Sequence, residues 1–162
     1  LGYRADHDVL TDLLNRDGLL MSLSERMPVH GRTTLALLYC DLDNLKPIND
    51  EYGHSAGDAV LVEVSRRIDA HLRRGDIVAR IGGDEFVIVL DRIASDSDAL
   101  SVAEKICVGA QGSVPFVGTD LPATVSMGIA IAEPTDTVES LLGRADQALY
   151  RAKTSGRARV ST

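Results

Sequence analysis

The segment RIGGDEFVIVL (residues 80–90) constrains the fold most, because it places two glycines and two adjacent acids between apolar runs. The flanking runs IVARI and EFVIVL are rich in β-branched residues, so the segment predicts a β-hairpin. In this interpretation Gly82 and Gly83 supply the positive φ of a tight turn, and Asp84 tolerates a turn conformation. A second interpretation is that the acids in the turn serve chemistry.

The rest of the chain alternates between strand-like and helical patterns. Apolar residues at helical spacing or in short β-rich runs predict the remaining elements, with a polar connector over 46–54. Helices are expected over 8–27, starting near Asn15-Arg16, and over 55–72, 95–110 and 137–156; strands are expected over 33–43 and 123–132, with a weaker strand at Val114–Val117. Interleaved strands and helices with a hairpin predict an α/β sandwich, in which helices cover a mixed sheet.

Composition favours one globular domain over residues 1–162. The chain is 44% hydrophobic and 25% charged, and its net charge of −7 argues against a nucleic-acid partner. No apolar run is long enough for a membrane helix, so we expect no membrane contact by this domain. Cys40 and Cys107 form no C-x-x-C pair, which favours reduced thiols and a cytoplasmic location. The chain starts at Leu1 rather than Met, and we expect it to be a piece of a longer multidomain protein.

Carboxylates follow the first strand and occupy the hairpin turn. If these strands are neighbours in one sheet, Asp41 shares an edge with Asp84 or Glu85, and paired carboxylates repel unless a cation joins them. An all-oxygen site favours Mg²⁺ or Mn²⁺, which commonly act on phosphates. The alternative is that these acids are simply solvated. Because side chains alternate along a strand, only one of the two hairpin acids is expected to face Asp41.

Four motifs in order resemble the GGDEF family, the diguanylate cyclases. GGDEF at 82–86 is similar to the family signature, and DVLTDLLNR at 8–16 is similar to its opening motif. DLDNLKPINDEYGHSAGD at 41–58 resembles its central block, and RADQALYRAKTSGR at 144–157 resembles its closing helix. The resemblance implies a five-stranded mixed sheet wrapped by helices, similar to nucleotidyl cyclase and polymerase palm cores.

Two positions depart from the family pattern. Leu45 stands where the family usually has Phe, and Pro47 follows Lys46. Both are apolar or backbone positions, so we expect altered packing and unchanged chemistry.

The resemblance implies a metal site at the edge of the sheet. Asp41 and Asp84 would hold two Mg²⁺ or Mn²⁺ ions per half-site, and the carbonyl of Leu42 would add a backbone ligand. The resemblance thus selects Asp84 as the acid opposite Asp41 and leaves Glu85 a supporting catalytic role. The two turn glycines would let the backbone approach a bound nucleotide closely.

By the same resemblance, several groups would bind the phosphates of GTP. The backbone N–H groups of Asn44 and Leu45 would face the phosphates, as helix starts do. Lys46, counted among the catalytic residues, would contact the β- and γ-phosphates together with Lys153 and Arg157. The alternative for Lys153 and Arg157 is a solvated helix end, where the helix dipole favours cations.

Guanine would be bound by Asn49 and Asp58. A carboxylate accepts from N1–H and the exocyclic amine, which adenine lacks, so GTP would be preferred over ATP. Asp58 also fits a capping box, Ser55-x-x-Asp58, at the start of a helix, and the sequence does not separate these roles. His54 would contact ribose or base, or serve a structural role.

Arg73 and Asp76 in the segment RRGD allow two interpretations. The residues fit a helix end, with cations in the last turn and Gly75 as the stop. Many family members carry R-x-x-D shortly before the signature, where it binds the product and restrains synthesis. The resemblance therefore implies a product-inhibition site at Arg73 and Asp76, where cyclic di-GMP would bind.

The implied activity is diguanylate cyclase, a nucleotidyltransferase. The 3′-hydroxyl of one GTP would attack the α-phosphorus of another, and two such steps yield cyclic di-GMP and two pyrophosphates. Each domain would carry one half-site, so catalysis needs a homodimer; LGYRADHD at 1–8 would end a stalk from a sensory module. One alternative is a degenerate domain that binds GTP or cyclic di-GMP as a regulatory module. Another is a cyclase acting within one nucleotide, which Asn49 disfavours.

Overall fold

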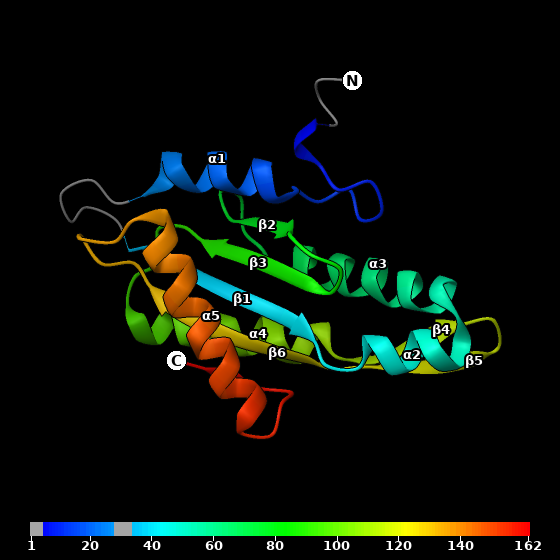
Figure 1. Ribbon diagram of the computed structural model, residues 1–162. Helices are drawn as coiled ribbons and strands as arrows, with labels where there is room; N and C mark the ends of the chain where they lie inside the picture. Colours follow the sequence, from blue (N-terminus) through cyan, green and yellow to red (C-terminus); the bar gives the residue numbers. More distant parts are fainter. Residues whose placement is uncertain (1–4, 28–33) are drawn as a thin grey trace.

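The computed structural model describes residues 5–27 and 34–162 (Figure 1). Its centre is a five-stranded mixed sheet with the strand order β2-β3-β1-β6-β7, which confirms the predicted architecture. β1 pairs antiparallel with both β3 and β6, whereas β7 runs parallel to β6. The strands of this sheet are β1 Ala36–Leu42, β2 Ile77–Arg80, β3 Glu85–Leu90, β6 Val125–Ile131 and β7 Val160–Ser161.

Helices cover both faces of this sheet, with α1 and α5 on one face and α3 and α4 on the other (Figure 1). A separate hairpin of β4 and β5 precedes β6. The remaining elements are α1 Arg16–Arg26, α2 Leu45–Tyr52, α3 His54–Ala70, α4 Asp96–Ala110, β4 Gly112–Phe116, β5 Thr119–Ala123 and α5 Val138–Thr154. Within the described ranges, no helix combines the length and apolar character needed to cross a membrane.

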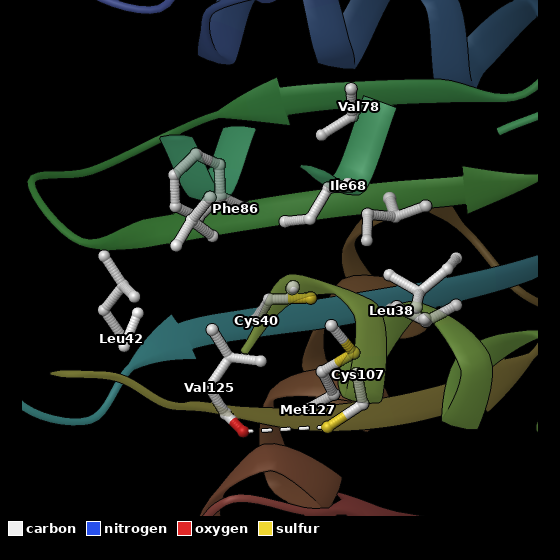
Figure 2. Close-up of a cluster of buried hydrophobic side chains, with 14 of the residues drawn as sticks. Leu38, Cys40, Leu42, Ile68, Val78, Phe86, Cys107, Val125 and Met127 are labelled. Carbon is white, nitrogen blue, oxygen red and sulfur yellow. Dashed lines mark hydrogen bonds between the residues drawn. The ribbon is translucent and has the colours of Figure 1, made fainter. Parts of the chain in front are cut away.

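Alternation along β1 divides the interior into two hydrophobic cores. Leu38 and Cys40 point into the core under α3 and α4, whereas Leu37 points into the core under α1 and α5. Figure 2 shows Cys40 and Cys107 in the first core, where the Cys107 thiol donates to the carbonyl of Val125 at 3.7 Å. Both cysteines are free and buried, as expected, and burial raises the pKa of the Cys40 thiol well above its usual value.

The expected polar connector over 46–54 is wrong, because residues 45–52 form α2. Pro47 is tolerated there because it lies in the first helical turn, where a backbone N–H has no intrahelical acceptor. Gly53 has φ +92 and separates α2 from α3, a conformation that favours glycine.

Several element boundaries also differ from expectation. The first helix begins at Arg16, because Asn15 caps it by accepting from the Gly18 N–H at 3.0 Å, and residues 8–14 are not helical. The sequence patterns did not predict the short strands β5 and β7. β5 forms by pairing with β4, and β7 forms by pairing with the distant strand β6. The expected strand start at Thr33 and residues 1–4 of the expected stalk end lie outside the described residues.

Gly128 in β6 lets α5 lie directly on the sheet. A Cβ at this position would lie 2.1 Å from the backbone nitrogen of Leu149 and 2.3 Å from the carbonyl oxygen of Ala145. Both atoms belong to the backbone of α5, so a side chain at residue 128 would force the helix to move.

We predict that Gly128→Ala lowers the free energy of unfolding by roughly 1–3 kcal/mol, because it overpacks this contact. The matched control is Gly143→Ala, where a Cβ on α5 meets open space. This control should raise the free energy of unfolding by up to about 1 kcal/mol through helix propensity. Urea denaturation measures both; equal stability of the Gly128→Ala variant and the unmodified protein would contradict the packing argument.

Candidate active site

The carboxylates of Asp41, Asp84 and Glu85 gather at one end of the central strands. The β1–β3 ladder places Glu85 opposite Asp41, so these side chains share the face covered by α1 and α5. Asp84 precedes β3, and its carbonyl accepts from the Leu42 N–H at 3.1 Å. The Asp84 side chain nevertheless interacts with the Asp41 carboxyl group. Of the two hairpin acids, Asp84 is the one whose carboxyl group interacts with Asp41, whereas the Glu85 carboxylate accepts from the Tyr39 hydroxyl.

Asp41 has an unusual electrostatic environment. Burial and the neighbouring Asp84 charge raise its pKa to about 6, against the opposing effect of Lys153. The Lys153 ammonium forms an ion pair with Oδ2 of Asp41, and Oδ1 is buried without a hydrogen-bond partner in the described structure. A buried carboxylate oxygen without a partner is costly, so this edge of the sheet suits a cation.

The donor set fits a hard divalent cation. Asp41 and Asp84 contribute carboxylate oxygens, and Leu42 follows Asp41 at the end of β1, where its N–H bonds to the Asp84 carbonyl. Among residues 5–27 and 34–162, no three His, Cys, Asp or Glu side chains cluster as a complete metal site. Backbone and ligand oxygens would therefore complete the coordination of Mg²⁺ or Mn²⁺, which prefer oxygen ligands.

The glycines of the turn do not serve the expected purpose. Neither Gly82 nor Gly83 has a positive φ, so the prediction that they supply one is wrong. The turn is instead closed by a hydrogen bond from the Ile81 N–H to the Glu85 carbonyl at 3.0 Å. A Cβ at Gly83 would meet open space, whereas a Cβ at Gly82 would lie 3.1 Å from a Glu85 carboxylate oxygen. The missing side chains thus leave room around the acids.

Arg80 ties the turn to the beginning of the chain, a role that the sequence interpretation missed. Its Nη1 lies 3.2 Å from both carboxylate oxygens of Asp8, and its Nη2 donates to the Gly83 carbonyl at 2.9 Å. Burial alone would raise the pKa of Asp8, but hydrogen bonds from Thr11 and Arg80 hold it below its usual value. The spacing of an arginine directly before the turn and an aspartate in the opening motif offered the only sequence signal.

Asp43 holds the loop after α5, which the sequence interpretation also missed. Its carboxylate accepts from the buried Ser126 hydroxyl at 2.6 Å and from the Ala158 N–H at 3.3 Å. Arg157 lies 3.9 Å from the same carboxylate. Asp43 therefore brings Arg157 to the sheet edge near Asp41, although Asp43 and Arg157 are 114 positions apart in the sequence.

Tyr39 is a third residue that the sequence interpretation missed. It lies on the same face as Asp41 and Glu85 and lines a cavity of about 170 Å³ with Arg16 and Asp146. Burial and the Glu85 carboxylate raise the pKa of the Tyr39 hydroxyl well above its usual value, so the hydroxyl remains a donor toward Glu85.

The expected phosphate-binding residues are only partly brought together. Asn44 is the N-cap residue of α2 and makes no side-chain cap, so its helix start leaves backbone N–H groups for another acceptor. The Asn44 amide donates to the Pro122 carbonyl at 2.9 Å, and its own oxygen is buried without a partner in the described chain. Lys46 is 86% exposed and pairs with Asp50 at 3.0 Å, so it lies on the outer surface of α2.

The expected guanine-binding residues meet where α2 turns into α3. The Asn49 side-chain oxygen is buried without a partner in the described residues and packs on Gly57, where a Cβ would lie 1.8 Å away. Asp58 follows Gly57 and is exposed. The capping-box interpretation is wrong, because Gly53 is the N-cap residue and Ser55 lies inside α3. His54 is exposed at the first position of α3.

Arg73 and Asp76 lie in a loop and not at a helix end. α3 ends at Ala70, so the interpretation of Gly75 as its stop is wrong. The Asp76 side chain is 3% exposed and accepts from the Arg73 N–H at 2.9 Å and the Asp91 N–H at 3.0 Å. The Arg73 guanidinium donates to the Asp91 carbonyl at 2.7 Å and remains 61% exposed.

Two cavities lie beside the elements that carry the candidate site. A cavity of about 690 Å³ lies between α4, α5 and the end of β6, lined by Ile131, Arg144 and Arg151 among others. None of the expected site residues lines it, whereas Gly82 lines a second cavity of about 400 Å³ together with Arg16 and Arg80.

Comparisons with known proteins agree with this arrangement. The sequence profile described as "Diguanylate cyclase, GGDEF domain" matches residues 5–159. Diguanylate cyclase TpbB of Pseudomonas aeruginosa (strain UCBPP-PA14) is 43% identical over 97% of this chain and 37% of its own length. Diguanylate cyclase DgcM of Escherichia coli (strain K12) is 43% identical over 99% of this chain and 39% of its own length. The chain thus spans less than two-fifths of these curated relatives.

Solved structures of GGDEF domains have the same fold. The structure of TpbB from Pseudomonas aeruginosa comprising only the GGDEF domain matches with a TM-score of 0.91 and 40% identity, covering 96% of this chain and 92% of that one. The GGDEF domain of DgcB from Caulobacter crescentus, solved in complex with c-di-GMP, matches with a TM-score of 0.84 and 34% identity over 97% and 95% of the two chains. With a family profile over nearly its whole length and paired acids in the signature turn, the chain belongs to the GGDEF domain family of diguanylate cyclases.

Proposed function

We propose that this domain is a diguanylate cyclase that condenses two GTP molecules into cyclic di-GMP and releases two pyrophosphates. The observation that carries the proposal is the pair of interacting carboxylates, Asp41 and Asp84, at the end of β1 with Lys153 beside them. Such a pair suits phosphoryl chemistry, in which charge on oxygen must be neutralised.

Asp41, Asp84 and the carbonyl of Leu42 would hold Mg²⁺ or Mn²⁺, two ions per half-site. When bound, these ions supply activation of the 3′-hydroxyl and neutralisation of the leaving pyrophosphate. Glu85 lies opposite Asp41 and supports the carboxylate pair from the same face. The open space at Gly83 leaves room for the nucleotide to approach the turn.

The chain's own cations and N–H groups would bind the phosphates. Lys153 and Arg157 lie at the sheet edge, and the first turn of α2 presents backbone N–H groups from Asn44 and Leu45. Lys46 would have to turn from Asp50 to reach the phosphates, which costs little because exposed ion pairs are weak.

Asn49 and Asp58 would bind the guanine edge, with His54 beside them. The buried Asn49 oxygen without a partner supports this role, since such a group gains most from a donor on a ligand. Asp58 is exposed one residue beyond the glycine against which Asn49 packs, so both can reach one base.

Ring closure would need two domains that face each other, because one chain offers one half-site. Cyclic di-GMP would also restrain the enzyme by binding to Arg73, whose guanidinium is largely exposed. Asp76 is engaged by two backbone N–H groups, so its role at this product-inhibition site would be to hold the loop that carries Arg73.

A second candidate is a regulatory module that binds GTP or cyclic di-GMP without catalysis. The observation that favours this candidate is that the similar GGDEF domain of DgcB was solved with c-di-GMP bound. A chromatographic product assay with GTP and Mg²⁺ separates the two candidates. Formation of cyclic di-GMP supports the cyclase, whereas nucleotide binding without product supports the module.

We predict that Asp84→Ala lowers cyclic di-GMP formation more than about a hundredfold, because it removes one of the two carboxylates. The turn position holds no core volume, so circular dichroism and the melting temperature should change little. Asp120→Ala, on the exposed hairpin strand β5, is the matched control and should retain activity. Substantial synthesis by the Asp84→Ala variant would reject the metal assignment.

We predict that Asp58→Ala weakens GTP binding roughly 5- to 150-fold and leaves ATP binding unchanged, because a carboxylate contact to guanine is worth about 1–3 kcal/mol. The melting temperature should stay constant, since Asp58 does not cap α3. Asp69→Ala, at the exposed end of the same helix, is the control for removing one charge. Unchanged GTP affinity in calorimetry would remove Asp58 from the guanine site.

We predict that Mn²⁺ binding weakens as the pH falls through about 6, because the pKa of Asp41 is raised to about 6 and the protonated carboxyl no longer attracts a cation. The raised pKa means that protonation of Asp41 stabilises the fold at low pH, and this stabilisation is lost as the pH rises through about 6. Mn²⁺ titrations between about pH 5 and pH 8 measure the affinity. A His54→Ala, His71→Ala double variant should keep the same pH dependence of Mn²⁺ affinity. If the double variant loses this pH dependence, histidine and not Asp41 causes it.

A further inference from the structure

We propose that Lys153 competes with the divalent cation for Asp41, so that the site takes up metal together with the nucleotide and resists metal alone. The inference rests on the proposed function, since it concerns the same carboxylate. It assigns Lys153 a second role besides phosphate binding, that of coupling the two ligands.

The contact between Lys153 and Asp41 is the starting point. Their side chains are 28% and 13% exposed, so the ion pair is partly withdrawn from water and stronger than a surface pair. Lys153 lies in the last turn of α5, and α5 is held against the sheet at Gly128. The helix backbone therefore keeps the ammonium within reach of the carboxylate.

A divalent cation cannot share Asp41 with this ammonium at low cost. Oδ2 carries the lysine, and Oδ1 is the buried oxygen that a metal ion would use. An ammonium and a metal ion on the two oxygens of one carboxylate repel each other, and the partly buried site screens that repulsion less than bulk water does. Metal alone must therefore displace the lysine into solvent and forfeit the ion pair.

A nucleotide changes this balance. The flexible stem of lysine lets the ammonium move from Asp41 to a phosphate, exchanging one anionic partner for another. Metal and triphosphate then each gain from the presence of the other, which is positive coupling between two ligands.

Two other cations near the proposed nucleotide site lack this property. Arg157 pairs with Asp43, whose carboxylate is also bound by Ser126 and Ala158, and it makes no ion pair with Asp41. Lys46 pairs with Asp50 on the surface of α2. Both therefore serve as controls for the general effect of removing one positive charge.

The experiment is a calorimetric Mn²⁺ titration without nucleotide, on the unmodified protein and on Lys153→Met, Lys46→Met and Arg157→Met. We expect Lys153→Met to bind Mn²⁺ roughly 5- to 150-fold more tightly than the unmodified protein. The Mn²⁺ affinities of Lys46→Met and Arg157→Met should differ from that of the unmodified protein by less than about threefold, because their charges are screened by water. An unchanged or weakened Mn²⁺ affinity in Lys153→Met, or an equal gain in all three variants, would overturn the proposal.

A second titration includes 3′-deoxy-GTP, which binds but cannot react for lack of the attacking hydroxyl. In the unmodified protein this analogue should tighten Mn²⁺ binding, and in Lys153→Met the tightening should shrink. Circular dichroism checks folding; if Lys153→Met is unfolded, Lys153→Gln replaces it with the same expected sign. Equal tightening in both proteins would overturn the coupling.

The outcome is separable from that of the proposed function, because Mn²⁺ affinity is read without turnover. If the unmodified protein forms no cyclic di-GMP but Lys153→Met gains Mn²⁺ affinity, the competition holds and the cyclase assignment fails. If product forms but Lys153→Met shows no gain, the cyclase assignment holds and the competition fails.

Discussion

The close approach of the Asp41 and Asp84 carboxylates is the constraint on which the rest of the site depends. Burial and the neighbouring Asp84 charge raise the pKa of Asp41, and the fold opposes this with the Lys153 ammonium from α5. The arrangement is stable only because β1, the signature turn and the last helix are held in a fixed mutual position. The antiparallel β1–β3 ladder and the contact of α5 with Gly128 provide that position.

The polar groups around the pair are supported from distant parts of the chain. Arg80 links the turn to Asp8 in the opening motif, and Asp43 fixes the loop that carries Arg157. Arg80 and Asp43 each make several hydrogen bonds or ion pairs within the fold. These contacts restrict the movement of the signature turn and of the loop that carries Arg157. Lys46, Asp58 and Arg73 are different, because they are exposed; Lys46 pairs with Asp50 at the surface, and Arg73 donates to the Asp91 carbonyl.

Buried oxygens without partners mark the positions where the fold leaves binding capacity unused. Within the described ranges they include side-chain oxygens of Asp41, Asn44 and Asn49, which lie at the end of β1 and along α2. Since a buried polar group normally finds a partner, three such atoms on one short stretch of chain point to a ligand-binding segment. The same stretch carries the central motif by which the chain resembles its family.

The sequence by itself determined the family, the hairpin and the mixed sheet with helices, because these follow from local periodicity and from motifs contiguous along the chain. Periodicity left Asp84 and Glu85 open as the acid opposite Asp41, and only the family resemblance selected Asp84. It could not determine that residues 45–52 are helical, that Gly53 and not Ser55 starts α3, or that Asp76 serves its own loop. Nor could it pair Lys153 with Asp41 or Arg80 with Asp8. Only the tertiary structure decided these points, because they depend on strand register and helix packing between segments that are far apart in the chain.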